Sequence, residues 1–165
     1  MLCFGIMSLV GCGEEQESET LQADKTVQNT ESFQASKSEQ EIESQSAKEE
    51  NRMKVSIGNS VFTATLENNS AVDSLIEMMK NEPLVIDMSD YSGFEKVGSL
   101  GKTLPANNRQ TTTQSGDIVL YNGDQIVIFY GSNSWSYTRI GRIDDLSGWE
   151  DALGRGSVTV TFSIE

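Results

Sequence analysis

Residues 116–131 read GDIVLYNGDQIVIFYG, and this stretch constrains the fold more than any other part of the chain. Two runs rich in β-branched and aromatic residues flank Asn122-Gly123, and an Asn-Gly pair in that setting is a strong hairpin signal. A second hairpin is predicted where MKVSIG and SVFTATL flank Gly58-Asn59. The chain should therefore fold around antiparallel strands.

Further strands and two helices complete the expected pattern. A helix after Ser70 is indicated by apolar residues at i, i+3, i+4 and i+7, and Ser70 with Asp73 resembles a capping box. Strands are expected in LVIDM, YTRIGRI and SVTVTFSIE, and a short helix in LSGWEDAL. Seven or eight short strands with two helices predict a mainly β fold, a closed antiparallel β-barrel of about eight strands.

A short apolar segment at the start of the chain ends in Leu9-Val10-Gly11-Cys12, which matches the lipobox of bacterial lipoproteins. The segment is too short for a bilayer core about 30 Å thick, but it fits the hydrophobic part of a signal peptide. No basic residue precedes Lys25, so we expect Met1 to lie inside a longer signal. We expect residues 1–12 to be a signal segment whose Cys12 carries a lipid and anchors the protein to the extracytoplasmic face of the cell membrane. The alternative is an ordinary N-terminal helix with a chance cysteine.

Residues 13–52 hold 11 acidic and 4 basic residues and a single aromatic residue, Phe33. Such a composition buries too little apolar surface to offset the conformational entropy lost on folding, so we expect a disordered acidic linker rich in Glu, Gln and Ser. A six-residue repeat runs from TLQADK to SEQEIE. It could indicate a β-helix, but no glycine turns the corners, and we interpret it as a duplicated tether.

The remaining residues, 53–165, contain no cysteine, and the whole chain contains no histidine. Disulfides, cysteine nucleophiles and cysteine metal sites are therefore excluded from this domain, and the commonest general base is missing. The domain holds 14 acidic and 8 basic residues, which is not the basic surface that nucleic-acid binding requires. We expect a monomeric domain with no cofactor, no metal and no nucleic-acid partner.

The order of these elements resembles that of the cyclophilins, and especially of small bacterial cyclophilin-like domains. The sequences SGDIVLY, QIVIFYG and TRIGRID resemble the barrel strands of that family in order and spacing. The short helix at Trp149–Leu153 and the last strand, VTVTFSI, extend the likeness over essentially all of 53–165. The resemblance implies a cyclophilin-like barrel. It also makes the family's activity, the cis–trans isomerisation of peptidyl-proline bonds, a candidate function for this domain.

The residues that catalyse this reaction in cyclophilins are replaced here. The family directs an arginine at the prolyl amide, and its motif runs from that arginine through Pro-Gly-Phe to a glutamine. The Gly-Phe pair matches Gly93-Phe94, the arginine position falls on Ser89, and the glutamine position falls on Val97. Neither Ser89 nor Val97 can direct a strong donor at an amide. The resemblance therefore implies the scaffold without the usual catalytic residues.

A candidate binding groove follows from the same resemblance. The family's pocket tryptophan corresponds to Trp135 and its histidine falls near Tyr137, so we expect a groove that contains Phe94, Trp135, Tyr137 and Arg139. Arg139 is the best candidate for a substitute donor. Alternatively, Arg139 and Arg142 stand three apart in one strand, on opposite faces, and balance nearby surface acids. Trp135 is either a groove residue or part of the barrel packing.

Two further motifs have simpler interpretations. GSLGKT at 98–103 lacks the first glycine of a phosphate-binding loop, because Lys96 holds that position and Pro105 follows where a helix should begin. The spacing of a calcium-binding loop is absent from a set of acids that we interpret as surface carboxylates: Asp87, Asp90, Asp144 and Asp145. The sequence therefore predicts a membrane-tethered module that binds a peptide, a protein or a small molecule. A divergent peptidyl-prolyl isomerase is the alternative.

Overall fold

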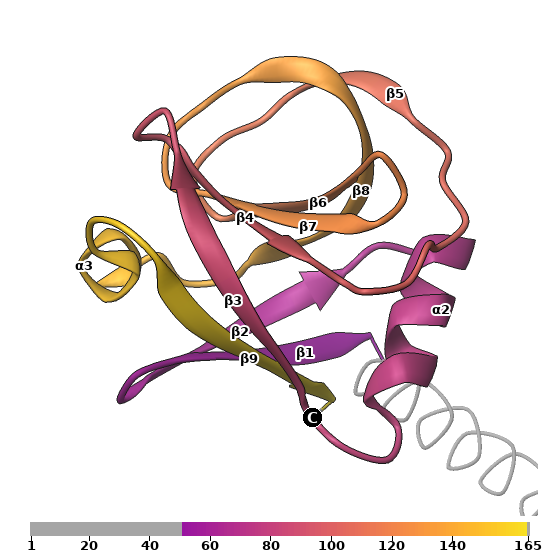
Figure 1. Ribbon diagram of the computed structural model, residues 1–165, viewed down its shortest axis with the longest axis horizontal. Helices are drawn as coiled ribbons and strands as arrows, with labels where there is room; N and C mark the ends of the chain where they lie inside the picture. Colours follow the sequence, from indigo (N-terminus) through magenta and orange to yellow (C-terminus); the bar gives the residue numbers. More distant parts are fainter. Residues whose placement is uncertain (1–50, 165) are drawn as a thin grey trace, which may run out of the picture.

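Nine strands and two helices make up residues 51–164, the part of the chain that the computed structural model describes (Figure 1). The helices are α2 (Ser70–Met79) and α3 (Trp149–Leu153). The strands are β1 (Arg52–Ile57), β2 (Ser60–Leu66), β3 (Leu84–Tyr91), β4 (Glu95–Ser99), β5 (Arg109–Thr112), β6 (Asp117–Tyr121), β7 (Gln125–Phe129), β8 (Ser134–Ile143) and β9 (Val158–Ile164). Cys12, the lipobox and the six-residue repeat lie outside the described residues. Within 51–164, no helix has the length and apolar character needed to cross a membrane.

Eight of these strands close into an antiparallel barrel. Neighbouring strands follow the order β2-β1-β9-β3-β4-β7-β6-β8, and β2 pairs with β8 to complete the ring. The ninth strand, β5, adds to β8 outside the ring. The prediction of a mainly β fold, a closed antiparallel barrel of about eight strands with two short helices, is confirmed.

The Asn122-Gly123 hairpin forms between β6 and β7, as the sequence predicted. Tyr121 pairs with Gln125, and the turn holds Asn122 and Gly123 in the left-handed region, with φ of 51° and 79°. Asparagine and glycine tolerate this conformation better than other residues. The local sequence is therefore sufficient to fix this turn.

Helix α2 is capped by a different residue from the one that the sequence pattern indicated. The Oδ1 atom of Asn69 accepts hydrogen bonds from the backbone amides of Ala71 (3.0 Å) and Val72 (3.1 Å), which makes Asn69 the N-cap. Ser70 is the first helical residue, so the capping-box interpretation is wrong. Asparagine caps helices as well as serine does, and here it also donates from Nδ2 to the Arg139 carbonyl (2.9 Å), which ties α2 to β8.

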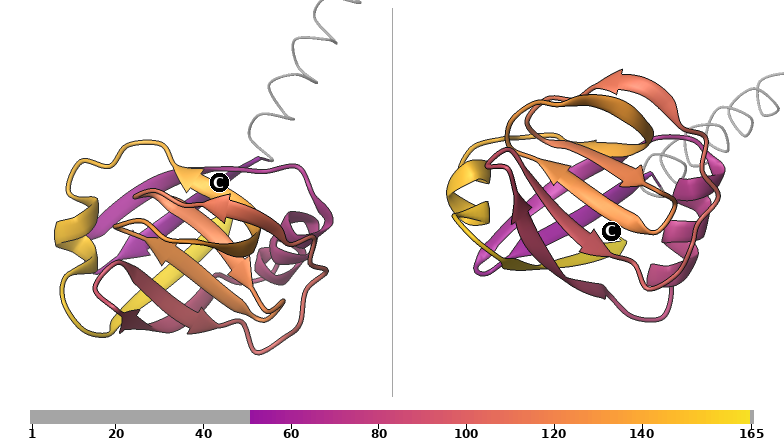
Figure 2. Two further views of the ribbon diagram at one scale, coloured as in Figure 1. Left: turned by 90° about the horizontal axis from the view of Figure 1, so that it is seen from above. Right: turned by 45° about the horizontal axis from the view of Figure 1, so that its top comes forward.

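The two helices cover opposite ends of the barrel (Figures 1 and 2). From α2, Val72 and Leu75 enter the core, and from α3, Trp149 does the same. The Trp149 ring packs edge-to-face on Phe62 at 4.9 Å, and its indole N–H donates to the Phe129 carbonyl (2.9 Å). Trp149 is therefore a packing residue whose polar atom has a partner.

Strands β4, β6 and β7 are largely buried on both faces. Their inner face belongs to the barrel core, and their outer face carries Val119, Val127 and Phe129, which form a second apolar cluster together with Tyr137 of β8. Strand β8 curves over this outer face and carries β5 with it (Figures 1 and 2). Burial on both faces explains why DIVLY and QIVIF read as continuous apolar runs rather than alternating ones. The candidate site lies over this outer cluster.

Candidate functional site

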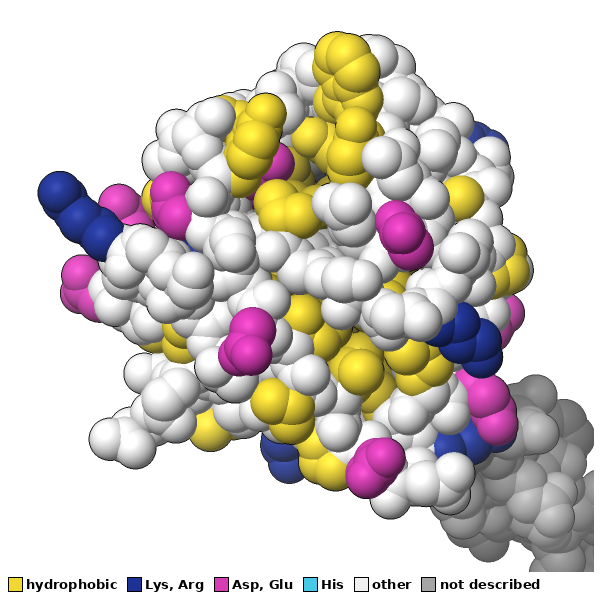
Figure 3. Space-filling model, viewed as in Figure 1, with side chains coloured by type: hydrophobic (Ala, Val, Ile, Leu, Met, Phe, Trp, Pro, Cys, Tyr) yellow, Lys and Arg dark blue, Asp and Glu magenta, His cyan; other side chains and the backbone are white. Residues whose placement is uncertain are grey.

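A cleft of about 340 Å³ lies on the outer face of the barrel, over the second apolar cluster. Its apolar lining includes Val97 and Val127. The rest of the lining combines aromatic rings with one carboxyl group and two amides: Tyr91, Tyr121, Trp135, Tyr137, Glu95, Gln125 and Asn133. In Figure 3, hydrophobic side chains gather around a hollow at the top of the view, with acidic atoms visible among them.

Glu95 is buried in the lining of this cleft, and one of its oxygens has no partner. The residue is only 6% exposed, and its Oε2 atom has no hydrogen-bond partner among residues 51–164. Burial raises the pKa of the Glu95 carboxyl group to about 7. Buried carboxyl groups are normally hydrogen-bonded or paired, because an isolated charge is costly away from water. An exception inside a cleft marks a candidate functional group.

The β3–β4 turn sets the position of Glu95. Ser92 and Gly93 both adopt positive φ, 53° and 74°, and the Phe94 amide donates to the Tyr91 carbonyl (3.3 Å). Glu95 then begins β4 directly opposite Tyr91. Because side chains alternate along a strand, Glu95 and Val97 face the cleft while Lys96 between them faces the barrel interior.

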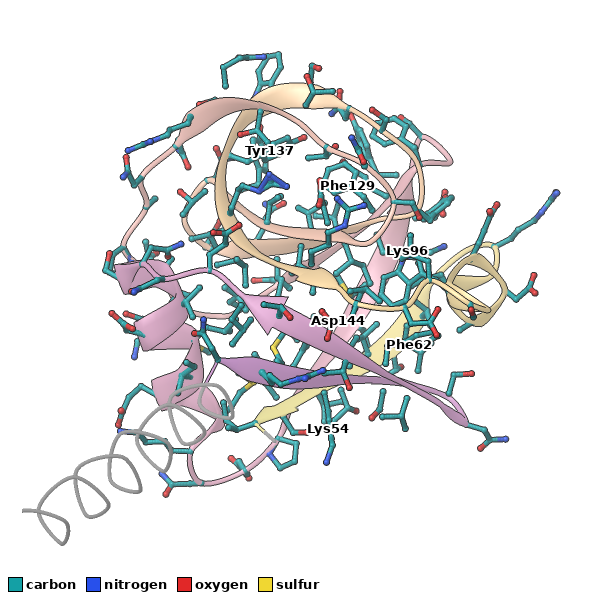
Figure 4. All side chains as sticks on the ribbon, turned by 180° about the vertical axis from the view of Figure 1, so that it is seen from behind. Lys54, Phe62, Lys96, Phe129, Tyr137 and Asp144 are labelled. Carbon is teal, nitrogen blue, oxygen red and sulfur yellow. The ribbon has the colours of Figure 1, made fainter. Side chains whose placement is uncertain are left out.

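Aromatic rings form the walls of the cleft. Tyr137 packs edge-to-face against Phe129 (5.8 Å between centroids) and Tyr121 (6.1 Å), and its hydroxyl oxygen accepts from Asn133 Nδ2 (3.0 Å). Figure 4 shows Phe129 and Tyr137 under the curve of β8. Burial raises the pKa of the Tyr137 hydroxyl, and the Glu95 charge adds to that shift. Tyr137 therefore faces Glu95 as a neutral phenol.

Two aromatic residues at the cleft remain open to solvent. Tyr91 is 59% exposed and Trp135 is 57% exposed, and both line the cleft. Large exposed aromatic side chains are enriched at binding surfaces, where they become buried on contact with a ligand. Trp135 is therefore a cleft residue and not barrel packing.

Of the four residues that the sequence placed in the groove, two line the cleft and two do not. Trp135 and Tyr137 line the cleft. Phe94 lies behind its wall, stacked on Phe129 at 6.5 Å and edge-to-face with Tyr91 at 6.2 Å. Arg139 does not line the cleft but a separate hollow beside β5.

Arg139 forms ion pairs with two acidic residues beside that separate hollow. Its Nη2 atom lies 3.1 Å from the Asp117 carboxylate, and its Nε atom lies 3.8 Å from that of Glu67. Arg142 Nη1 lies 3.7 Å from the same Asp117 oxygen, so the expectation that the two arginines face opposite sides is wrong. The reason is a bulge: β8 fits an extra residue, Ile140, between the partners of the two adjacent β6 residues, which puts both arginines on one face.

The positions that correspond to the cyclophilin arginine and glutamine lie side by side. Ser89 on β3 pairs directly with Val97 on β4, and Val97 lines the cleft. Ser89 does not line the cleft, and neither residue carries a strong hydrogen-bond donor. The sequence reasoning passed over Glu95, although the run FEKV carries two adjacent charges inside a strand of mostly small or apolar residues.

A larger and shallower hollow of about 920 Å³ lies beside α2, near the first described residue. Its lining includes Asn51, Ile76 and Lys80. Within 51–164, the buried side-chain atoms that lack a hydrogen bond are on Glu95 and Asp117, and neither lines this hollow. The cleft at Glu95 is therefore the better candidate for a site.

Comparisons with known proteins agree with this architecture. A hypothetical protein from Archaeoglobus fulgidus, known from a solution structure, matches with a TM-score of 0.50 and 16% identity. The match covers 70% of this chain and 95% of that one, and at such low identity it shows a shared fold alone. A search of curated proteins gave no match. Residues 55–163 match the model of the cyclophilin-like family, and the chain belongs to that family.

Proposed function

We propose that this cyclophilin-like domain is a binding module and that its ligand site is the cleft around Glu95. The observation that carries this proposal is the buried Glu95 carboxyl group, which has no partner for Oε2 within 51–164 and lines a cleft rich in aromatic rings. A few polar groups among aromatic and apolar side chains are typical of small-molecule sites, and about 340 Å³ lies within their usual size range. The module is held at the extracytoplasmic face of the membrane by a lipid on Cys12.

A titration of the isotope-labelled chain tests the binding function. Metabolites and short peptides are added singly, and backbone and indole N–H signals are followed by NMR. We expect ligands to shift the Trp135 indole and the amides around Glu95, and Trp135→Ala should weaken binding. Val85→Ala is the matched control, because Val85 is 62% exposed and lies outside the cleft lining. Shifts confined to other surfaces would contradict the proposed site.

A divergent peptidyl-prolyl isomerase is the second candidate, favoured by the family and by Val97, which falls at the family's glutamine position and lines the cleft. Cyclophilins stabilise a twisted amide with a preorganised donor, and the loss of such a donor typically costs about 10² to 10³ in rate. Ser89 is too short to replace it, and Arg139 is held by Asp117. We therefore expect isomerase activity to be weak or absent.

A protease-coupled assay on proline tetrapeptides decides between the two candidates. The wild type is measured beside Arg139→Ala and Phe94→Ala. We expect all three to match the uncatalysed rate, which corresponds to tens to hundreds of seconds. Robust turnover in the wild type would favour the isomerase, and its loss in Arg139→Ala alone would identify the arginine as a rebuilt donor.

Membrane attachment is tested by replacing the lipobox cysteine. We expect Cys12→Ala to release the full-length protein from the membrane fraction of the cell, because a bacterial lipid anchor supplies two or more acyl chains and one chain alone binds only marginally. Cys3→Ala is the matched control and should leave the protein in the pellet. If Cys12→Ala also stays in the pellet, the lipid anchor is excluded.

A further inference from the structure

The cleft contains a hydrogen-bond acceptor that has no donor among the described residues. Glu95 Oε2 is buried and lacks a donor among residues 51–164. Leaving a buried charged acceptor unpaired costs more than leaving a neutral one unpaired, so a ligand that brings a donor recovers that cost on binding. The strongest donor for a carboxylate is a cationic N–H group.

The domain itself brings no cation to Glu95. Among the described residues, no Lys or Arg lines the cleft, and its other titratable groups are three tyrosines from β3, β6 and β8. Lys96 is adjacent in sequence but points into the barrel, where Asp90 and two carbonyls engage it. Arg139 pairs with Asp117. Among residues 51–164, no side chain supplies a positive charge to Glu95, so a cationic partner would have to come from a ligand.

The aromatic rings around Glu95 suit the same kind of ligand. The face of a tyrosine or tryptophan ring attracts cations, with about 0.5–2 kcal/mol per contact depending on solvent exposure. The planes of the Tyr121 and Tyr137 rings lie at 66° to each other, and the rings of Tyr91 and Trp135 are exposed at the cleft. A cation in the cleft can therefore meet ring faces and edges from several directions. The domain itself holds 14 acidic and 8 basic residues, and this excess of negative charge attracts cations and repels anions.

We propose that the cleft binds a small organic ammonium ion, a protonated primary or secondary amine that donates an N–H to Glu95 and lays its carbon skeleton against Tyr91, Trp135 and Tyr137. This inference rests on the proposed binding function and adds the class of ligand. The unpartnered Oε2 atom requires a donor, which favours an amine with N–H groups over a quaternary ammonium ion. The cleft volume of about 340 Å³ limits the ligand to a small molecule.

Binding is coupled to the ionisation of Glu95. Burial raises the pKa of Glu95 to about 7 in the free protein, whereas an ammonium partner favours the ionised form. The complex therefore releases protons on formation at neutral pH, and affinity rises from about pH 5.5 to about pH 8. Burial raises the pKa of the Tyr137 hydroxyl beside Glu95 further above this range, so Tyr137 stays neutral. Glu95 is the group in the cleft lining that produces this dependence.

Three probes that share a benzyl group and differ in the polar head test the proposal on the full chain: benzylamine, benzyltrimethylammonium and benzyl alcohol. NMR titration gives each affinity, and calorimetry of benzylamine in two buffers of different ionisation enthalpy gives proton release. We expect benzylamine to bind most tightly, to shift signals around Glu95 and Trp135, and to release protons near neutral pH.

Variants assign the effect to Glu95. We expect Glu95→Gln to weaken benzylamine about 10- to 100-fold and to abolish both proton release and the pH dependence. Glu82→Gln removes the same charge from an exposed site outside the cleft and should leave affinity within about twofold. Trp135→Ala, at a position that is 57% exposed, should weaken benzylamine several-fold.

The possible outcomes separate this inference from the binding function. Equal affinity for benzyl alcohol or benzyltrimethylammonium, with shifts still in the cleft, would overturn the ammonium class and leave the binding function standing. Unchanged affinity in Glu95→Gln would overturn the role of the carboxylate. If none of the three probes shifts a cleft signal, the inference is overturned, and the wider panel of metabolites and peptides then decides the binding function on its own.

Discussion

Glu95 and Lys96 are neighbours on β4 that point to opposite faces of the same sheet, and only one of them has its charge satisfied. Lys96 is fully buried, and its ammonium group donates to Asp90 (2.6 Å) and to the carbonyls of Gly154 (3.0 Å) and Gly156 (2.8 Å). Glu95 Oε2 has no partner within 51–164. A buried charge with a complete set of partners is typical of a structural role, whereas an unsatisfied one in a cleft is typical of a functional site.

Lys96→Met should destabilise the domain by roughly 3 kcal/mol, because Asp90 and two carbonyls lose a buried donor. Urea denaturation measures the change in the free energy of unfolding. Lys54→Met is the control, since Lys54 is exposed on β1 and points away from the barrel (Figure 4), and its effect should stay within about 0.5 kcal/mol. Similar losses in the two variants would contradict a structural role for Lys96.

Glu95→Gln should change how stability depends on pH. Burial raises the pKa of Glu95 from 4.5 to about 7, so between these values the folded state binds more protons than the unfolded state. The contribution of Glu95 to the free energy of unfolding therefore falls as pH rises through this window. Relative to wild type, Glu95→Gln should gain roughly 1–3 kcal/mol between about pH 5 and pH 8.

The comparison of Glu95→Gln with wild type at each pH isolates this effect from other carboxylates. Asp90 titrates with the opposite sign, because the hydrogen bond from Lys96 holds its pKa below the usual value and its contribution is lost on acidification. That contribution is common to both proteins and cancels in the difference. A difference that stays flat from about pH 5 to pH 8 would show that Glu95 has an ordinary pKa.

Gly141→Ala should open the barrel where β2 meets β8. A Cβ atom at Gly141 would lie 2.5 Å from the Thr65 carbonyl oxygen, which belongs to the backbone and cannot rotate away. We expect a loss of roughly 1–3 kcal/mol and faster amide exchange along β2. Hydrogen exchange of the Glu67 amide, which donates to the Ile140 carbonyl of β8 (2.8 Å), localises the effect when compared with amides of the β6–β7 hairpin. Uniform exchange changes across the domain would contradict a local opening at this seam.

The parts of the fold that local signals control were predictable from the sequence, and the rest depended on pairing between distant residues. Asn122-Gly123 is sufficient to define its turn. Strand β5, with the sequence RQTT, has no apolar alternation because it is exposed and exists through its pairing with β8. Trp135 and Tyr137 could be placed through the family resemblance. The isolation of Glu95 could not, because it depends on the residues that β3, β7 and β8 bring around it.

The side of β8 on which Arg139 lies was also predicted wrongly, because it depends on how β8 pairs with a distant strand. Strand alternation predicted the side on which Arg139 and Arg142 point, but the bulge in β8 shifts that alternation by one residue. A bulge depends on the partner strand, and the YTRIGRI run alone gives no sign of it. The arginine that was expected to serve as a donor therefore pairs with Asp117 instead.

The ionisation of Glu95 in the presence and absence of an amine is the most direct measurement of the central claim, that this carboxyl group is buried in the cleft and lacks a cationic partner. The side-chain carboxyl carbon of Glu95 is followed by NMR as pH changes, with Glu95→Gln to assign the signal. We predict a pKa of about 7 in the free protein, caused by burial, and a lower pKa when benzylamine is bound. A pKa near the ordinary value of 4.5 that does not move with benzylamine would contradict the claim.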